Sequence, residues 1–525
     1  GNMADFVREY KVTHQIKLEQ NYRSFSNILD SANHLISHNK GRLGKNLHTT
    51  QGAGEPVRVY ESPTDFAEAQ WMVEEMKQLL RDGQNGDGAN GVQHRSEIAV
   101  LYRSNAQSRV IETALFNAAM PYRVYGGLRF FERAEIKHAL AYLRLLENPR
   151  DDTSFMRVVN FPPRGIGARS IEQLQDAARA MGCAMSDAVT AVAGKAGANL
   201  SAFVAKIDVL REQTQGQNLR QIIELLLDHS GLITHYQGER EGQDRIENLQ
   251  ELVNAAESFV TQEGFGRDAV ALPIDEHGEP VVTDGNTPAT PQTMINADTG
   301  ETLSPLAAFL THAALESGDN QAQAGQDAIQ LMTVHASKGL EFDCVFITGM
   351  EEGLFPHENS MNDFDGLEEE RRLMYVAITR ARKRLYLSHS QTRMLHGQTR
   401  YNLKSRFFDE LPEHTLKWIT PARSAFADAM PTRRDAWQNN NGWQNNAWGG
   451  GATAVAPKPV PQRAAPVTSG PNAWVRSGVQ VFHAKFGEGA VISIEGVGDD
   501  ARAQVNFPRH GTKWLALSVA KLTQV

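Results

Sequence analysis

Apolar and polar positions follow two different periods along the first part of the chain. Short apolar runs predict strands, and longer runs with apolar residues three or four positions apart predict amphipathic helices. The expected strands are 15–18, 56–60 and 98–102, and the expected helices are 26–37 and 66–80. Because the third strand is apolar throughout, as a strand buried on both faces is, residues 1–118 are predicted to form an α/β unit with a parallel sheet.

The pattern becomes mainly helical over residues 119–325. Within this block, residues 264–305 are rich in Gly, Pro, Thr and Asp, which is typical of a flexible insertion without structure of its own. The α/β pattern returns over 326–420, with strands expected at 329–334, 344–348 and 384–388 and a helix at 367–382. Two α/β segments around a helical block predict one domain interrupted by another, an arrangement that surface loops tolerate.

The end of the chain divides into a polar segment and a small β unit. Residues 421–473 are rich in Asn, Gln, Gly, Ala and Pro, which predicts a disordered linker. Its tryptophans at 437, 443 and 448 are open to two interpretations, a low-complexity tether or aromatic anchors for a partner. Residues 474–525 hold four or five short strands about ten residues apart with glycines between them, which predicts a small β-barrel.

Composition narrows the class of protein. The 525 residues suggest about three or four domains. The 62 acidic and 53 basic residues give a net charge of −9, which excludes a uniformly basic nucleic-acid binder but leaves room for a local basic site. No apolar run is long enough to span a membrane. The two cysteines, Cys183 and Cys344, form no CxxC motif, which favours a reducing compartment such as the cytoplasm.

The first candidate site is the segment LEQNYRS, residues 18–24, between a predicted strand and a predicted helix. Ligands bind at the carboxyl edge of open α/β sheets, and the free N–H groups of a helix start favour an anion. Arg23 would strengthen a preference for phosphate. A plain surface turn is the alternative.

The second candidate site is TVHASKGLEF, residues 333–342, where two apolar strands bracket a polar loop. Thr333, His335 and the loop's Ser and Lys offer donors that suit phosphodiester oxygens. His335 is otherwise a structural histidine, and a metal site is not expected because no second ligand stands at a suitable spacing. Glu341 is open to two interpretations, a ligand of ribose hydroxyls or an ordinary carboxylate at a strand edge.

The third candidate site is the helix predicted over EEERRLMYVAITRAR, residues 368–382. Leu373, Ala377 and Arg380 lie at i, i+4 and i+7, so Arg380 is expected on the apolar stripe. A guanidinium there needs an anionic partner. That partner is either a structural Glu or the γ-phosphate of a nucleotide.

Taken together and in this order, the three segments resemble motifs IV, V and VI of the UvrD/PcrA/Rep-type superfamily 1 DNA helicases. RSNAQSR at 103–109, the segment 121–146 and PRGIG at 163–167 also resemble this family. The last fifty residues resemble the Tudor-like domain of its UvrD branch. The resemblance implies a RecA-like domain (2A) interrupted by a helical 2B subdomain, followed by a linker and a Tudor- or SH3-like barrel.

The resemblance also implies roles at matching positions around a nucleotide. Tyr22 would stack on adenine, Arg23 and Arg380 would contact the γ-phosphate, and Glu341 would bind the ribose. The implied cofactors are ATP and Mg²⁺.

Further positions would contact DNA. Thr333 and His335 would hold the backbone of single-stranded DNA, and Asn105 and Arg109 are candidates for the same track. The backbone N–H groups of the turn formed by Arg164, Gly165 and Gly167 would approach phosphates of a duplex.

The chain departs from the family in one respect. It contains no GxxxxGK[ST] loop and no DExx motif before LEQNYRS. We therefore expect a C-terminal portion that lacks the first RecA-like subdomain, where the Mg²⁺ ligands are expected, and that is inactive as an ATPase by itself.

The function expected of the full-length protein is ATP-dependent 3′-to-5′ unwinding of DNA in repair, on single strands and duplex junctions, in the bacterial cytoplasm with the nucleoid. The barrel would bind RNA polymerase or a repair protein. One alternative is a non-catalytic module that binds DNA and RNA polymerase. Another, a helicase–nuclease fusion, lacks the carboxylate-rich motif it would need in the C-terminal region.

Overall fold

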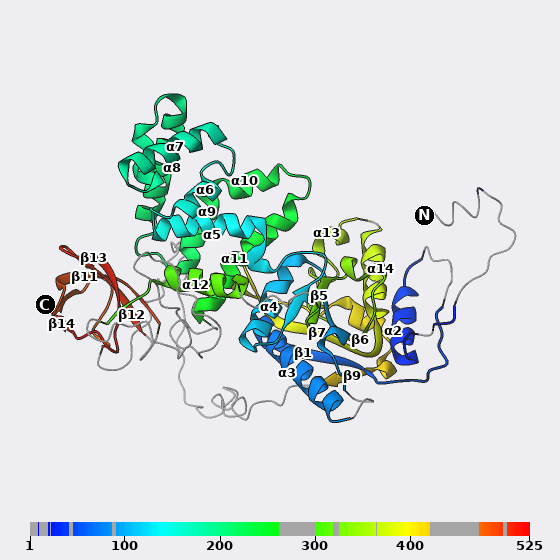
Figure 1. Cartoon of the computed structure of the whole chain (residues 1–525). Helices are drawn as coiled ribbons and strands as arrows, with labels where there is room; N and C mark the ends of the chain where they lie inside the picture. Colours follow the sequence, from blue (N-terminus) through cyan, green and yellow to red (C-terminus); the bar gives the residue numbers. More distant parts are fainter. Residues whose placement is uncertain are drawn as a thin grey trace, which may run out of the picture.

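A computed structural model describes residue 9 and residues 19–21, 23–40, 46–86, 91–261, 300–318, 325–363, 365–419, 472–496 and 501–525. Figure 1 shows a sheet covered by helices, a block of helices beside it and a small β-barrel. The strand predicted at 15–18 and the tryptophans of the predicted linker lie outside the described residues.

Eight strands of the described chain form the main sheet, in the order β3-β5-β2-β6-β7-β1-β9 with β8 paired to β7. All neighbours in this path are parallel, and only β8 is antiparallel. The strands are β1 (Val57–Thr64), β2 (Ile98–Tyr102), β3 (Tyr122–Val124), β5 (Ile329–Thr333), β6 (Phe342–Ile347), β7 (Ala381–Leu395), β8 (Gln398–Tyr401) and β9 (Leu416–Ile419).

Two apolar cores cover the two faces of this sheet. In β2, Ala99 and Leu101 belong to one core, while Ile98, Val100 and Tyr102 belong to the other. Full burial of each large apolar side chain contributes about 1.5–3 kcal/mol, so a strand with no polar face is stable only between two layers. The first core is closed by α2 (Ser26–Ile36) and α14 (Gly366–Ile378), and the second by α3 (Asp65–Gln84) and α4 (Ser108–Asn117). A short helix, α13 (Glu358–Met361), precedes α14.

The helical block lies between β3 and β5 in the chain and has its own apolar core. Its helices are α5 (Ala134–Glu147), α6 (Asp152–Val158), α7 (Ala168–Met181), α8 (Gly194–Gln213), α9 (Leu219–Ser230), α10 (Leu232–Gln237), α11 (Gly242–Thr261) and α12 (Pro305–Gly318). Within the described ranges, no helix combines the length and the apolar character that a membrane crossing requires.

The barrel is a second, antiparallel sheet in the order β14-β10-β11-β12-β13-β4. Its strands from the C-terminal region are β10 (Gln480–His483), β11 (Gly487–Glu495), β12 (Arg502–Phe507), β13 (Gly511–Ala516) and β14 (Leu522–Gln524). The sixth strand, β4 (Glu301–Thr302), comes from the helical block, directly before α12. This sheet confirms the small β-barrel predicted from the glycine-punctuated strands.

The structure corrects the sequence-based prediction at three boundaries. The sheet domain extends past residue 118, because β3 pairs with β5. Part of the predicted insertion is ordered, because 300–305 contains β4 and the start of α12. The helix predicted over 367–382 ends at Ile378, so Arg380 lies in the turn before β7 and not on the helical stripe that includes Ala377.

A buried charge network fixes the carboxyl edge of the sheet. Arg393 of β7 pairs with Glu68 of α3 at 2.9 Å and with Glu351 of the loop after β6 at 2.8 Å. Burial disfavours the charge of Arg393, yet the two carboxylates raise its pKa well above its usual value. Glu68 also accepts hydrogen bonds from Thr348 and Ser388, so α3, β6 and β7 meet at one carboxylate.

Replacing Arg393 by alanine leaves two carboxylates buried without their shared cation. We expect Arg393→Ala to lose about 3–5 kcal/mol of unfolding free energy, measured by urea denaturation of the full chain. The control is Arg372→Ala, which removes an arginine of α14 that is 47% exposed and paired only with Glu368 and Glu369. The control is expected to change stability by at most about 0.5 kcal/mol, and equal losses in both variants would contradict the assignment.

Candidate functional site

Arg23 lies in a turn that is fixed from two sides. The side chain of Asn21 accepts hydrogen bonds from the backbone N–H groups of Arg23, at 2.8 Å, and of Ser24, at 3.0 Å. Such local bonding by Asn favours a turn over a continued strand or helix. The buried Ser24 hydroxyl donates to the carbonyl of Ala381 at 2.6 Å, which ties the turn to the first residue of β7.

Glu341 holds two arginines at this place. Its carboxylate forms an ion pair with Arg23 and a second one with Arg382, at 3.2 Å. The Arg23 guanidinium also donates to the carbonyl of Thr379 at 3.4 Å. All these side chains are partly exposed, so the pairs are accessible to solvent and each contributes little to stability.

Arg380 approaches the same carboxylate from the end of α14. Its guanidinium donates to the carbonyls of Val376 at 3.0 Å and Leu340 at 2.8 Å, and to the Thr379 hydroxyl at 3.3 Å. The structural Glu partner considered for Arg380 is absent, because within the described chain no carboxylate lies within ion-pair distance of it. Burial, and secondarily the charge of Arg23, lower the pKa of Arg380.

We call Arg23, Arg380 and Arg382, together with Glu341, the arginine cluster. Like charges that the fold brings together at a partly exposed place are typical of a binding site for an anion. Guanidinium groups suit phosphate oxygens in particular, because they offer several donors in one plane. The donor set therefore fits the polyphosphate of a nucleotide. Tyr22, the residue predicted to stack on adenine, lies outside the described residues.

The described residues offer no metal site beside this cluster, since no three His, Cys, Asp or Glu side chains among them are grouped to hold an ion.

Two members of the arginine cluster lie at the amino edge of the sheet. Glu341 directly precedes β6 and Arg380 directly precedes β7, and these strands are parallel neighbours. The carboxyl edge was expected only for residues 18–24, after the strand predicted at 15–18. That strand lies outside the described residues, so this expectation stays a prediction.

The DNA candidates after β5 and β2 do lie at the carboxyl edge. Thr333 ends β5 opposite Tyr102, the last residue of β2, and Val334 donates its N–H to Tyr102 at 2.9 Å. The Thr333 hydroxyl accepts from the N–H of Ala336, which folds residues 335–337 into one helical turn. His335 is exposed on this turn. Burial by neighbouring atoms and the charge of Arg103 lower its pKa, so the imidazole is neutral at pH 7.

Asn105 and Arg109 follow β2, but the structure separates their roles. Asn105 is exposed in the loop after β2, next to the turn that holds His335. Arg109 is 3% exposed, and its Nε donates to Glu251 of α11 at 2.8 Å. In this arrangement Arg109 joins the sheet domain to the helical block and does not face a DNA strand, which corrects our interpretation of this residue.

The turn between α6 and α7 presents two exposed glycines. Gly165 has φ 72°, a conformation that favours glycine, and Gly167 is the residue before α7 with open space where a side chain would be. Arg164 points inward, where its guanidinium donates to the carbonyls of Val158 at 2.9 Å and Ser230 at 3.1 Å. The two glycines are therefore exposed at the surface of the turn, while the Arg164 side chain supports the turn from inside.

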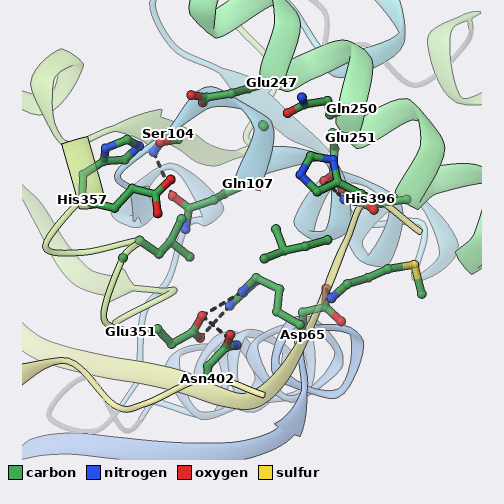
Figure 2. A pocket seen from close by; sticks show the side chains of 18 of the residues that line it. Asp65, Ser104, Gln107, Glu247, Gln250, Glu251, Glu351, His357, His396 and Asn402 are labelled. Carbon is green, nitrogen blue, oxygen red and sulfur yellow. Dashed lines mark hydrogen bonds and ion pairs between the residues drawn. The ribbon is translucent and has the colours of Figure 1, made fainter. Parts of the chain in front are cut away.

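A hollow of about 370 Å³ lies where the sheet domain meets the helical block. Figure 2 shows Glu247, Gln250 and Glu251 of α11 across from Glu351 and Asn402. Because the lining is rich in carboxylates, the hollow disfavours phosphate oxygens. The arginine cluster is thus the better candidate for a nucleotide.

Two functional side chains were missed from the sequence. Arg382 completes the arginine cluster. Its position two residues after Arg380 could have identified it, because side chains two positions apart at the start of a strand point to the same side. Arg103 forms a two-pronged ion pair with Glu370 of α14, at 2.8–3.2 Å, beside the His335 turn. Its partner lies 267 positions away in sequence, and no local pattern identifies it.

Comparison with known proteins gives matches over the whole chain. A family model described as the UvrD-like helicase C-terminal domain matches residues 16–392, and one described as the PcrA/UvrD tudor domain matches residues 478–524. DNA helicase II of Escherichia coli is 40% identical over 532 aligned positions, covering 100% of this chain and 64% of that protein. The ATP-dependent DNA helicase PcrA of Bacillus subtilis is 34% identical over 517 positions, covering 97% of this chain and 62% of that protein. The chain thus spans less than two thirds of the length of these relatives.

Replacing Arg109 tests whether this residue stabilises the fold through its ion pair with Glu251. Burial raises the pKa of Glu251, and removing its arginine leaves that carboxylate unpaired. We expect Arg109→Ala to lower the melting temperature, because an unpaired buried charge costs about 3–5 kcal/mol. The loss should shrink as the pH falls, since a protonated Glu251 needs no cation. Asn105→Ala, in the turn just before α4, is the control and should leave the melting temperature unchanged; a loss that does not vary with pH would contradict this prediction.

Proposed function

The chain belongs to the UvrD-like helicase family, and from this premise we propose that it forms the C-terminal part of an ATP-dependent DNA helicase. The observation that carries this proposal is the arginine cluster. Arg23 and Arg380 come from opposite ends of the sheet domain's sequence, yet the charge of one lowers the pKa of the other. A polyphosphate would neutralise both guanidinium groups at once.

Each member of the arginine cluster has a distinct role in this proposal. Arg23 and Arg380 would stabilise the γ-phosphate of ATP, and Tyr22 would stack on the adenine. Glu341, which pairs with Arg23 in the described structure, would accept the ribose hydroxyls when Arg23 turns to the phosphate. ATP with Mg²⁺ supplies the free energy of hydrolysis, and the Mg²⁺ ligands would come from a first RecA-like subdomain. By itself the chain would then have no ATPase activity.

One short segment joins the nucleotide edge to the DNA edge. Residues 334–340 run from Thr333, at the carboxyl edge, to Glu341, at the amino edge. Arg380 holds the end of this segment by donating to the Leu340 carbonyl at 2.8 Å. A shift of Arg380 toward a phosphate would change that hydrogen bond. The change would move the turn that holds His335, which would couple the nucleotide to the grip on DNA.

Single-stranded DNA would follow the carboxyl edge past Thr333, His335 and Asn105. A duplex would meet the exposed turn at Gly165 and Gly167, whose N–H groups suit phosphate oxygens. We propose that the protein moves 3′ to 5′ on single strands and unwinds duplex junctions in DNA repair, in the bacterial cytoplasm with the nucleoid. The barrel would bind RNA polymerase or a repair protein. The alternative is a non-catalytic module that binds DNA and RNA polymerase.

The first test removes the guanidinium of Arg380 in a full-length protein that contains this chain. Arg380→Ala is expected to lower the rate of ATP hydrolysis by about 10³-fold or more, the scale of a transition-state arginine. Affinity for single-stranded DNA, measured by fluorescence anisotropy, should stay within about twofold. Arg372→Ala, on the exposed face of α14, is the matched control and should leave both quantities unchanged. Equal loss of ATPase activity and DNA affinity would show that Arg380 is structural, and full activity without it would favour the non-catalytic module.

The second test separates neutral from charged contacts with DNA. Because His335 is neutral at pH 7, His335→Ala should weaken single-strand binding about fivefold, the worth of one hydrogen bond, without changing the salt dependence. Lys338 is exposed in the same loop, so Lys338→Ala should reduce the slope of log affinity against log salt by about 0.7. A reduced slope in the His335 variant, or unchanged affinity in both variants, would contradict the proposed DNA track.

A further inference from the structure

The outer strand of the barrel is not part of the C-terminal region. β4 pairs antiparallel with β13, with Trp514 opposite Thr302 and Leu515 opposite Glu301. The Ala516 N–H donates to the Gly300 carbonyl at 2.7 Å. A segment of the helical block thus closes an edge that would otherwise expose unpaired backbone groups.

Side chains make this pairing specific. Lys513 forms an ion pair with Glu301 at 2.8 Å, and Arg502 donates to the Thr302 hydroxyl at 2.9 Å. Gly300 has φ 70°, and a Cβ there would lie 2.7 Å from the backbone N of Ala520. The β13 edge therefore selects a strand with three successive residues of defined type: glycine, an acidic residue and a residue with a hydroxyl group.

The paired strand also fixes the barrel against the helical block. Ser304 follows β4, donates to Glu147 of α5 at 2.9 Å and accepts from the Ala307 N–H in the first turn of α12. On the other side, Ile492 of β11 lies against Gly216, in the loop between α8 and α9. The barrel and the helical block therefore meet at more than one place.

One contact in this interface is unfavourable. Glu495 of β11 faces Glu257 of α11, and its Oε2 is buried without a hydrogen-bond partner. Burial and the charge of Glu257 raise the pKa of Glu495 to about 7, against a smaller opposing effect of Arg502. Glu257 in turn lies near Arg220 at 3.8 Å and near Glu224. Docking thus buries a carboxylate against a like charge, which favours release.

We propose that the β13 edge is a strand-binding site that Gly300–Thr302 occupies in cis, and that this strand must leave before the edge pairs with an extended segment of a protein partner. The partner segment carries an acidic residue to meet Lys513 and glycine before it to fit against Ala520. Addition of a strand to a free sheet edge is a common mode of peptide recognition. The binding of a partner segment rests on the proposed role of the barrel in protein binding. The pairing of Gly300–Thr302 with β13 within the same chain, which we call cis docking, does not.

Cis docking is tested by hydrogen exchange of single amides in the full chain. Gly300→Val should speed exchange of the Ala516 N–H by about tenfold or more, because its acceptor leaves. The Leu517 N–H, which donates to Ala501 inside the barrel, should keep its protection and so report an intact barrel. Gly325→Val is the matched control, since Gly325 also has positive φ but open space around it. Glu301→Lys, a milder change, should also deprotect Ala516, and unchanged exchange in both variants would overturn cis docking.

Partner binding is tested with a synthetic peptide that has the sequence of residues 297–305. Added to the Gly300→Val chain, it should restore the protection of Ala516, and a peptide with Lys in place of Glu301 should not. In the unmutated chain the first peptide should have a weaker effect, because the edge is already occupied. Equal restoration by both peptides, or by neither, would overturn the strand-binding site while leaving cis docking and the helicase function standing.

The like-charge pair gives docking a pH dependence. The docked state binds a proton at Glu495 more tightly than the released state, so docking is strongest at low pH and weakens as the pH rises from the usual pKa of Glu through about 7. The protection factor of Ala516, corrected for intrinsic exchange, should fall over that range in the unmutated chain and stay level in Glu495→Gln. The same fall in both chains would show that Glu495 does not control docking.

Discussion

The arrangement of this chain depends on the buried charges around Arg393. Without its two carboxylates, the arginine could not continue β7 beyond the end of the sheet. That continuation carries the β7–β8 hairpin to the helical block, where the Gly397 N–H donates to Asn254 of α11 at 2.8 Å. A domain inserted into a loop needs such a second contact, because its two covalent connections alone leave its orientation free. The ion pair of Arg109 with Glu251 adds another contact at the same junction.

The two edges of the sheet are given different electrostatic characters by this framework. At the carboxyl edge the acidic groups Glu68 and Glu351 are paired with Arg393, and the loops after β2 and β5 expose the neutral side chains of Asn105 and His335. At the amino edge Glu341 pairs with Arg23 and Arg382, Asp343 also pairs with Arg382, and Arg380 adds a third guanidinium. Under the proposed function, a polyanionic strand and a polyphosphate would therefore bind to one domain at separate places, about one strand length apart, or roughly 20 Å.

Local pattern predicted most elements of the fold, and the reasons for its failures are physical. The apolar run at Ile98–Tyr102 and the helical spacing in α2 gave the right structures because each depends on neighbours in sequence. The end of α14 was misplaced because Thr379 and Arg380 continue the helical pattern although the chain already turns into β7. The partner of Arg109 and the pairing of β4 with β13 are long-range contacts, which no spacing rule contains. At the candidate site the motifs named Arg23, Glu341 and Arg380, but the ion pair of Arg23 with Glu341, 318 positions away, follows from no local pattern.

The fold brings like charges together at two places in this molecule. The two places differ in what reduces the electrostatic repulsion. In the arginine cluster Glu341 already lies between the guanidinium groups, so the folded state tolerates the arrangement and a phosphate improves it. Between Glu495 and Glu257 the charge of Arg502 offsets only part of the repulsion, and further relief is a proton or separation of the two surfaces. The first arrangement favours capture of a ligand, whereas the second favours movement. Separation would break the pairing of β4 with β13 and the contact of Ile492 with Gly216, and it would remove the repulsion between the two carboxylates.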